Sequence, residues 1–253
     1  MKGHSKMLKM ILLLLAIGLA GCSATWAVIA YLGRSQTVAV RSIENPSGDL
    51  YLIHLKKPKE LIWEPGSYAK VTLPEVEESG QKSRWLTLAS NPDENEVLLL
   101  THKSGSSFKK NLTSLSAGSR VKISWIESSL KIKDKHTPLV CFASDVGIAA
   151  LRPLALKWVG KRKIVLNHLD KGVNVFDEEM KGLDNQEDQF SYNRSASLFQ
   201  SKASLEKAVE KYGKEATYLV AGQPDDVKAM KAFLADQGIT ADRIKSETFR
   251  GLK

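Results

Sequence analysis

An arginine and a short polar segment have the residue types needed to bind a phosphate. Arg84 opens an apolar, strand-like run, and Ser106, Ser107 and Phe108 stand where a helical pattern begins. A bound pyrophosphate needs a cation together with backbone N–H groups, which the first turn of a helix leaves unpaired. Arg84 and the amides of the other three residues would supply both. The plainer alternative is that Arg84 is a surface arginine at a strand edge.

The cysteines and histidines exclude several kinds of metal and thiol chemistry. Cys22 and Cys141 are the only cysteines, too few for a disulfide framework, a four-thiolate zinc site or an iron–sulfur cluster. Cys141 stands in an apolar run and is expected to be a core thiol. Any redox chemistry must therefore come from an organic cofactor. Beyond the N-terminal segment the histidines lack the spacing of metal ligands, so no metal site is expected: His54, His102, His136 and His168.

Length and charge indicate the class of protein. The chain has 253 residues, of which 43% are apolar and 26% charged, a composition typical of a folded protein with one large domain or two ordinary ones. The formal net charge is +9, but residues 1–34 hold four basic and no acidic residues. The remaining 219 residues carry 33 basic and 28 acidic side chains, a net charge of +5 with no long basic run. Nucleic acid is therefore not expected as a partner.

The N-terminal segment has the character of a membrane anchor. From Met10 to Leu32 the chain has 23 residues without a formal charge, and a helix of about 20 residues spans a bilayer core. Three lysines precede this run, and the positive-inside tendency would send the rest of the chain out of the cytoplasm. Residues 19–22 resemble a lipoprotein cleavage box, which would leave lipid on Cys22. An uncleaved anchor and a lipoprotein both place the chain on a membrane; a buried soluble helix is the third alternative.

The residues that follow show the pattern of an antiparallel barrel. Short β-rich runs are separated by turn signals, and a helical stretch at 106–115 stands between the fifth run and the sixth. Six strands at this spacing favour a closed antiparallel barrel. The predicted strands are 37–44, 49–57, 68–74, 84–90, 96–103 and 120–127.

The pattern changes near residue 135 to apolar strands followed by helical stretches. Strands are predicted at 138–144, 163–169 and 217–222, and helices at 146–159, 175–183, 204–213 and 225–238. Strands that alternate with helices predict a parallel sheet in a Rossmann-like α/β domain. The expected organisation is a transmembrane helix or lipoprotein-type signal at 1–34, a β-barrel domain at 35–134 and an α/β domain at 135–253.

Five short motifs then point to a family. Because of these motifs, the sequence from Val38 to Lys253 resembles the ferredoxin reductase-like flavoproteins, in which an FAD-binding barrel precedes a nicotinamide-binding domain. The motifs occur in the family's order: the turn at 63–68, the flavin motif at 84–90, the pyrophosphate loop at 105–112, the strand end at 218–224 and the E-x-F-x-G sequence at 247–251.

The resemblance implies a set of residues that bind FAD. Thr87 would place its hydroxyl near the flavin N5, through which hydride enters and electrons leave, unless it is an ordinary strand residue. His102 and Lys103 would contact the ribityl chain or the ring edge, or else form a solvated strand end. The residues implied to bind FAD are Arg84, Trp85, Leu86, Thr87, His102, Lys103, Ser106, Ser107 and Phe108.

The resemblance also implies a catalytic set and a nucleotide-binding set. The catalytic set is Thr87, Glu247 and Phe249. Phe249 would cover the flavin, with core packing as the alternative, and Glu247 would be a proton or polarity partner, with a surface carboxylate as the alternative. The residues implied to bind a nicotinamide nucleotide are Gly147, Ile148, Gly222, Gln223 and Pro224.

The sequence departs from the family pattern at several positions. Leu86 stands where the family stacks an aromatic ring on the flavin. In the turn at 143–150, Ser144 and Asp145 replace glycines, and Gln223 replaces a proline farther along the chain. Backbone must approach a phosphate closely at this turn, and a carboxylate repels an anion unless it points away. These departures leave the use of a nicotinamide nucleotide open.

The expected function is that of a membrane-anchored FAD-dependent oxidoreductase. It would pass electrons from NADH or NADPH through the flavin N5 to a separate acceptor, which would be a protein, a quinone, a metal chelate or oxygen. The alternative is a flavin-binding electron-transfer or interaction module that lies outside the cytoplasm and does not use NAD(P)H. A flavin-free protein that keeps only the fold is a third hypothesis.

Overall fold

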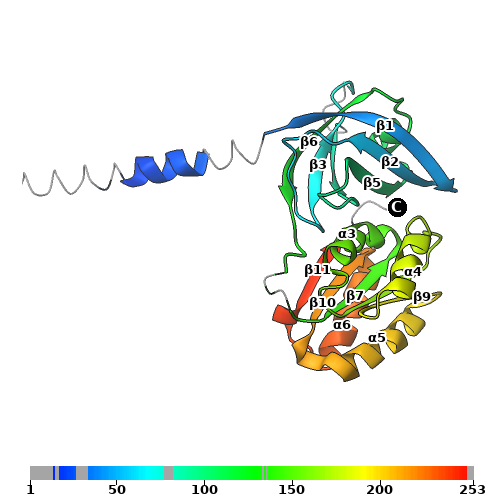
Figure 1. The fold of residues 1–253 in the computed structure, drawn as a ribbon. Coiled ribbons are helices and arrows are strands. Elements are labelled where there is room, and N and C mark those ends of the chain that lie inside the picture. Colours follow the sequence, from blue (N-terminus) through cyan, green and yellow to red (C-terminus); the bar gives the residue numbers. More distant parts are fainter. Residues whose placement is uncertain are drawn as a thin grey trace, which may run out of the picture.

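The computed structural model describes residue 14, residues 17–26, 34–76 and 82–132, residue 134 and residues 136–249. The described residues form a six-stranded antiparallel sheet and a five-stranded parallel sheet with helices on both faces (Figure 1). The chain leaves the first sheet at the end of β6 and enters the second at β7. The predicted barrel and parallel sheet are thus confirmed, and the domain boundary at 134/135 stays a prediction within this connection.

The first sheet closes into a barrel. Its strand order is β4-β3-β6-β1-β2-β5, and an isolated bridge between Leu88 and Leu99 joins the end of β4 to β5. Helix α2 (Ser107–Thr113) follows β5, and its Phe108 and Leu112 are fully buried in the barrel core. The strands are β1 (Gln36–Ser47), β2 (Leu50–Lys56), β3 (Tyr68–Thr72), β4 (Ser83–Thr87), β5 (Glu96–His102) and β6 (Arg120–Glu127).

The second sheet is parallel, with the order β11-β10-β7-β8-β9. Strands β7 and β10 are buried along their whole length, as expected for central strands covered on both faces. The strands are β7 (Leu139–Ser144), β8 (Ile164–Leu169), β9 (Phe190–Ser195), β10 (Thr217–Gly222) and β11 (Ile244–Thr248).

Two hydrophobic clusters hold the helices to the parallel sheet. Helices α3 (Ile148–Trp158) and α4 (Asp177–Gln186) contribute to one cluster, and α5 (Leu198–Tyr212) and α6 (Pro224–Asp236) contribute to the other. Short 3-10 turns occur at Asp145–Gly147, Gly213–Glu215 and Ala241–Arg243. The first cluster continues into the barrel through Leu52 and Leu98, which pack in the same core as α3. The barrel and the parallel sheet therefore share one apolar interface, and this interface fixes their relative position.

The structure adds three features that the sequence pattern did not predict. Strands β9 and β11 have the polar sequences FSYNRS and IKSET because each lies at an edge of the sheet, where one side meets solvent. Helix α5 begins at Leu198, six residues before the predicted start at 204. Its true start is set by Ser197, whose hydroxyl accepts a hydrogen bond from the Gln200 amide.

The predicted membrane segment at 10–32 lies in large part outside the described residues. Residue 14 and residues 17–26 are helical and exposed. Within the part of the chain that the structure describes, every helix falls short of the length and apolar character that a membrane span requires.

Candidate functional site

A cavity of about 590 Å³ lies where the barrel meets the parallel sheet. Most of its lining residues come from β4, from the segment that joins β5 to α2, and from the end of β11, so it collects three stretches that are far apart in the sequence. Seven of the predicted site residues line it: Arg84, Trp85, Leu86, Thr87, Ser106, Glu247 and Phe249.

One end of the cavity holds a buried carboxyl group beside a hydroxyl group. The Thr87 hydroxyl donates a hydrogen bond to Glu247 Oε1 over 2.6 Å, and the Ser129 hydroxyl donates to Oε2 over 3.4 Å. Glu247 is only 7% exposed. Burial raises the pKa of Glu247 to about 7, although both hydrogen bonds oppose the shift. This carboxyl group is thus poised to gain or lose a proton near neutral pH.

The other end of the cavity is cationic. The Arg84 guanidinium lies 5.8 Å from the centre of the Phe108 ring, and the Lys109 side chain forms part of the wall although it is 6% exposed. Burial lowers the pKa of Lys109. Ser104 and Ser106 add hydroxyl groups, and the Ser106 hydroxyl also accepts from the Lys109 amide at the start of α2. This end has the charge and the donors to bind a phosphate group.

Apolar side chains line the cavity between its two ends. Leu86, Leu100 and Val146 contribute aliphatic groups, and Phe249 contributes a ring. Trp85 is 51% exposed and packs edge to face on Tyr68, with ring centres 5.5 Å apart. A flat heteroaromatic ring with a phosphate-bearing chain, which is the chemistry of a flavin nucleotide, fits this combination of an apolar middle and a cationic end.

Sequence reasoning missed part of the cavity wall. Lys109, Ser104, Tyr68, Leu100, Val146 and Ser129 line the cavity but were not predicted as site residues. Lys109 lies within the predicted pyrophosphate loop at 105–112, directly after the predicted site residue Phe108, so its place at the start of α2 was a usable signal. Ser129 and Val146 carry no such signal, because only the packing of the two sheets brings them to the cavity.

The remaining residues of the predicted FAD set do not line the cavity. The Phe108 side chain fills the barrel core, and Ser107 is exposed in the first turn of α2. Lys103 is exposed, with its ammonium group 5.8 Å from the centre of the Tyr51 ring. His102 contacts Asp145 in the turn after β7.

The predicted nucleotide-binding residues gather at the ends of β7 and β10. A Cβ atom on Gly147 would lie 2.6 Å from the carbonyl carbon of Ala221, and one on Gly222 would lie 2.7 Å from Ser144 Cβ. Both positions therefore require glycine, and the two strand ends are packed directly on each other. Ile148 is fully buried at the start of α3, and Gln223 and Pro224 lead into α6.

A buried carboxylate occupies the turn after β7. Asp145 is 2% exposed and has a φ of 57°, in the left-handed region that glycine adopts most readily and aspartate more often than most residues. Its Oδ1 lies 2.7 Å from His102 Nε2, and its Oδ2 accepts a hydrogen bond of 2.7 Å from Gln223 Nε2. Burial alone would raise the pKa of Asp145, but the hydrogen bonds from His102 and Gln223 hold it below its usual value. A turn filled in this way does not fit the phosphates of a dinucleotide.

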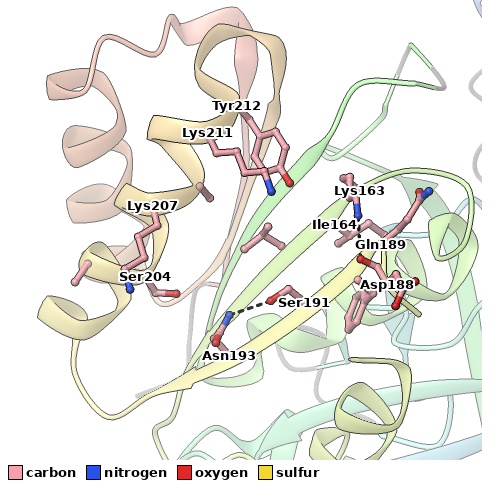
Figure 2. Close-up of a pocket in the computed structure, with 14 residues that line it drawn as sticks. Lys163, Ile164, Asp188, Gln189, Ser191, Asn193, Ser204, Lys207, Lys211 and Tyr212 are labelled. Carbon is pink, nitrogen blue, oxygen red and sulfur yellow. Dashed lines mark hydrogen bonds between the residues drawn. The ribbon is translucent and has the colours of Figure 1, made fainter. Parts of the chain in front are cut away.

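A second cavity, of about 580 Å³, lies in the parallel domain beside β8, β9 and α5 (Figure 2). It is bordered by the first residues of β8 and β9 and by α5, from which Lys207 and Lys211 project. Lys163 donates to the Asp188 carbonyl over 2.9 Å, and the Asn193 amide donates to Ser191 over 3.3 Å. The predicted catalytic, flavin-binding and nucleotide-binding residues all lie elsewhere, so the candidate site is the first cavity.

Comparison with protein-family models and with curated proteins gives no match. Solved structures do match. A cytochrome P450 reductase from Amycolatopsis is 18% identical, with a TM-score of 0.71 over 87% of this chain and 71% of that one. A ferredoxin NADP+ reductase from Neisseria gonorrhoeae with bound FAD and NADP is 14% identical, with a TM-score of 0.72 over 85% of this chain and 98% of that one.

A third match comes from a eukaryote. The CS-b5R domains of human Ncb5or, in the NAD+ form, are 16% identical, with a TM-score of 0.70 over 85% of this chain and 70% of that one. Identities this low establish the fold and leave the activity to the site itself. The barrel, the parallel sheet and these matches together show that the chain has the fold of the ferredoxin reductase-like flavoproteins.

Proposed function

We propose that this chain is a flavin-dependent oxidoreductase that takes electrons from a reduced donor and delivers them to a separate acceptor. The observation that carries the proposal is the cavity itself, in which Arg84, Thr87, Ser106 and Glu247 converge from three distant segments. A bound FAD would supply the electron-transfer chemistry that no side chain of this protein can perform. The chain contributes binding, orientation and the control of a proton.

The two ends of the cavity would divide the work of binding. Arg84 and Lys109, with the hydroxyl groups of Ser104 and Ser106, would hold the phosphates of the flavin nucleotide. The apolar middle would hold the ring system and keep water away from it. Leu86 offers no π-face for stacking, so we propose that contact with the ring depends on aliphatic packing and on Phe249.

The Thr87–Glu247 pair would control a proton beside the ring system. Glu247 Oε1 accepts the Thr87 hydroxyl proton when the carboxyl group is ionised, and a protonated Glu247 can donate in the opposite direction. Because the pKa of Glu247 is raised to about 7, both forms are populated at neutral pH. The pair would therefore be able to hold a proton at Glu247 or pass it toward Thr87 Oγ1 as the charge in the cavity changes.

Two classes of donor remain candidates. NADH or NADPH is the first, since the Neisseria gonorrhoeae reductase with this fold has bound NADP. A donor other than NAD(P)H is the second, and the buried Asp145 at the turn after β7 favours it. The acceptor would be a separate protein, a quinone or a metal chelate, because the two cysteines of the chain cannot hold an iron–sulfur cluster.

A titration of the full chain with FAD, followed by quenching of flavin fluorescence, tests the proposal. Arg84→Ala should weaken FAD binding by about tenfold or more, because it removes a charge-assisted bond to phosphate. Riboflavin, which has no phosphate, should bind both proteins equally. Arg41→Ala is the matched control, since Arg41 is an exposed barrel arginine that pairs with Glu96 outside the cavity. Equal FAD affinity for the wild-type and Arg84→Ala proteins would contradict the assignment of Arg84.

We also propose that residues 10–32 attach the protein to a membrane, as a single helix or through lipid on Cys22. The 23 uncharged residues and the preceding lysines support this, and the positive-inside tendency favours an extracytoplasmic catalytic domain. The full chain should stay with membranes after a carbonate wash. If Cys22 carries lipid, the mass of the mature chain should show it, and Cys22→Ser should abolish the modification. Recovery of the full chain in the wash would contradict membrane attachment.

A further inference from the structure

The turn after β7 lies at the point of the parallel sheet where a ligand is expected. From β7 the chain moves to β8 and β9 on one side, and then crosses to β10 on the other side of β7. In open α/β sheets, ligands bind in the crevice outside the carboxyl ends of the two strands at which the order reverses. Here the two strands are β7 and β10. Asp145 follows the first, and Gln223 follows the second.

Side chains of the protein itself close this crevice. The Gln223 amide donates to Asp145 Oδ2 over 2.7 Å, so a hydrogen bond crosses directly from one strand end to the other. The Lys171 ammonium donates to Gln223 Oε1 over 2.9 Å and pairs with Asp226 over 2.6 Å, which fixes the orientation of the glutamine. Beside this bridge, each of the residues from 144 to 148 is buried, so the turn offers a ligand in the crevice little exposed backbone.

The barrel supplies the other partner of the carboxylate. His102, the last residue of β5, places Nε2 2.7 Å from Asp145 Oδ1, and its Nδ1 lies 2.8 Å from Asp49 Oδ1. His168 Nε2 lies 2.9 Å from the carbonyl oxygen of Asp145. Both carboxylate oxygens and the carbonyl oxygen of Asp145 thus have partners, which come from the barrel, from β8 and from the residue that follows β10.

The surroundings of Asp145 favour a negative charge at this place. The N-terminal end of α3, an 11-residue helix, follows the turn directly and carries a partial positive charge. His102 adds a proton donor whose pKa is raised by its hydrogen bond to Asp145. In dinucleotide-binding proteins the same place, at the start of the helix after the first strand, receives a phosphate. In this chain the anion is already present and is covalently part of the turn.

We infer that the Asp145 carboxylate takes the place of a dinucleotide phosphate at the β7–β10 crevice, so that this crevice does not bind NADH or NADPH. The inference rests on the proposed flavin function, because it concerns which electron donors can reach the flavin and excludes NADH and NADPH. Three observations support it together: the burial of the turn, the hydrogen bond across the crevice and the His102–Asp145 contact.

Calorimetric titration of the flavin-free full chain with NADP+ and with NAD+ tests the inference without relying on flavin. The wild-type protein should give no saturable binding of either nucleotide. Asp145→Gly removes the carboxylate, suits a φ of 57° and frees His102 for a phosphate, so it should gain saturable binding of at least one of the two nucleotides. Asp49→Asn, which removes the other carboxylate beside His102 and leaves the turn intact, is the matched control and should behave as the wild type.

The outcomes are separable from those of the flavin proposal. Saturable binding of NADP+ or NAD+ to the wild-type chain would overturn the inference whether or not the protein binds flavin. Absence of binding to both the wild-type and a folded Asp145→Gly protein would overturn the role of Asp145. With FAD bound, anaerobic NADH and NADPH should leave the flavin absorbance of the wild type unchanged while dithionite bleaches it. Bleaching by either nucleotide would contradict the inference and leave the flavin proposal standing.

Discussion

At the scale of single residues, the central group is the carboxyl group of Glu247. It is buried at the end of β11 and accepts hydrogen bonds from Thr87 and Ser129, both of which belong to the barrel or its exit. Burial disfavours the charged form, and two neutral hydroxyl donors compensate for this only in part. The result is a pKa of about 7 for Glu247. The carboxyl group therefore gains and loses its proton near neutral pH, where a general acid or base works best.

Replacement of Glu247 by Gln should stabilise the fold at high pH. The pKa of Glu247 rises from 4.5 to about 7 on folding, so the folded state binds more protons than the unfolded state between these values. The contribution of the neutral carboxyl group to the free energy of unfolding is therefore fully present below pH 4.5 and is lost as the pH rises through 7. Glu247→Gln should unfold like the wild type near pH 4 and gain about 3 kcal/mol above pH 8.

Urea unfolding at a series of pH values measures this difference. Glu127→Gln is the matched control, because Glu127 is an exposed carboxylate near the same end of the barrel. A Glu247→Gln protein that is equally or less stable than the wild type above pH 8 would show that the charged carboxylate is well accommodated. Glu247 would then have no raised pKa and no role as a proton carrier at neutral pH.

At the scale of the elements, the contact between the ends of β7 and β10 shapes the candidate nucleotide crevice. Gly147 and Gly222 allow the two strand ends to touch through backbone atoms. Gly147→Ala would bring Cβ against the carbonyl group of Ala221, which is backbone of a central strand and cannot move aside. The variant should lose about 3 kcal/mol of stability through overpacking.

Gly182→Ala provides the contrast for this prediction. Gly182 lies inside α4, and a Cβ atom there would meet no other atom within 4 Å. The substitution should raise stability by about 0.5 to 1 kcal/mol, because alanine favours a helix more than glycine does. Thermal unfolding of the two variants should therefore shift in opposite directions. A Gly147→Ala protein as stable as the wild type would mean that the strand ends are not in close contact.

Most strands of the fold could be predicted from the sequence alone, whereas the contacts within the site could not. All six barrel strands and three of the five parallel strands were predicted, because their buried positions carry alternating or continuous apolar residues. Strands β9 and β11 were missed because edge strands have polar sequences. Thr87 and Glu247 could be predicted as separate motif residues, but their hydrogen bond depends on the contact between barrel and sheet. The positions of Ser129 and Val146 in the cavity and the contact of His102 with Asp145 depend on the same packing.

At the scale of the whole molecule, the barrel and the parallel sheet are joined by apolar packing and by polar contacts. Leu52 and Leu98 of the barrel pack in the same core as α3. Arg152 of α3 donates to the Ala89 carbonyl and to Glu94, both on the barrel side, and to Glu179 of α4. The His102–Asp145 contact is a second polar connection between the two units. Together, the apolar packing and these polar contacts fix the positions of the cavity walls relative to each other.

Replacement of His102 by Gln should weaken this connection in a pH-dependent manner. The raised pKa of His102 contributes stability that is complete below its ordinary value of 6.5 and is lost as the pH rises through the higher folded value. The lowered pKa of Asp145 contributes stability that is complete above 3.8 and is lost as the pH falls through the lower folded value. The wild type should therefore exceed His102→Gln in stability most clearly between pH 3.8 and 6.5.

Chemical unfolding of both proteins from pH 3 to pH 9 measures this difference. His54→Gln is the matched control, because His54 pairs with Glu96 inside the barrel and does not reach the parallel sheet. A stability difference for His102→Gln that does not change with pH would contradict an ion pair between the two units.

The most direct test of the account is the absorbance spectrum of the full chain after it is mixed with FAD and freed of excess cofactor. The cavity of about 590 Å³, with its cationic end and its apolar middle, predicts one retained flavin per chain and an absorbance band shifted from that of free FAD. A protein that is folded but leaves all the FAD in the wash, with no flavin band of its own, would contradict the central claim that this cavity is a flavin site.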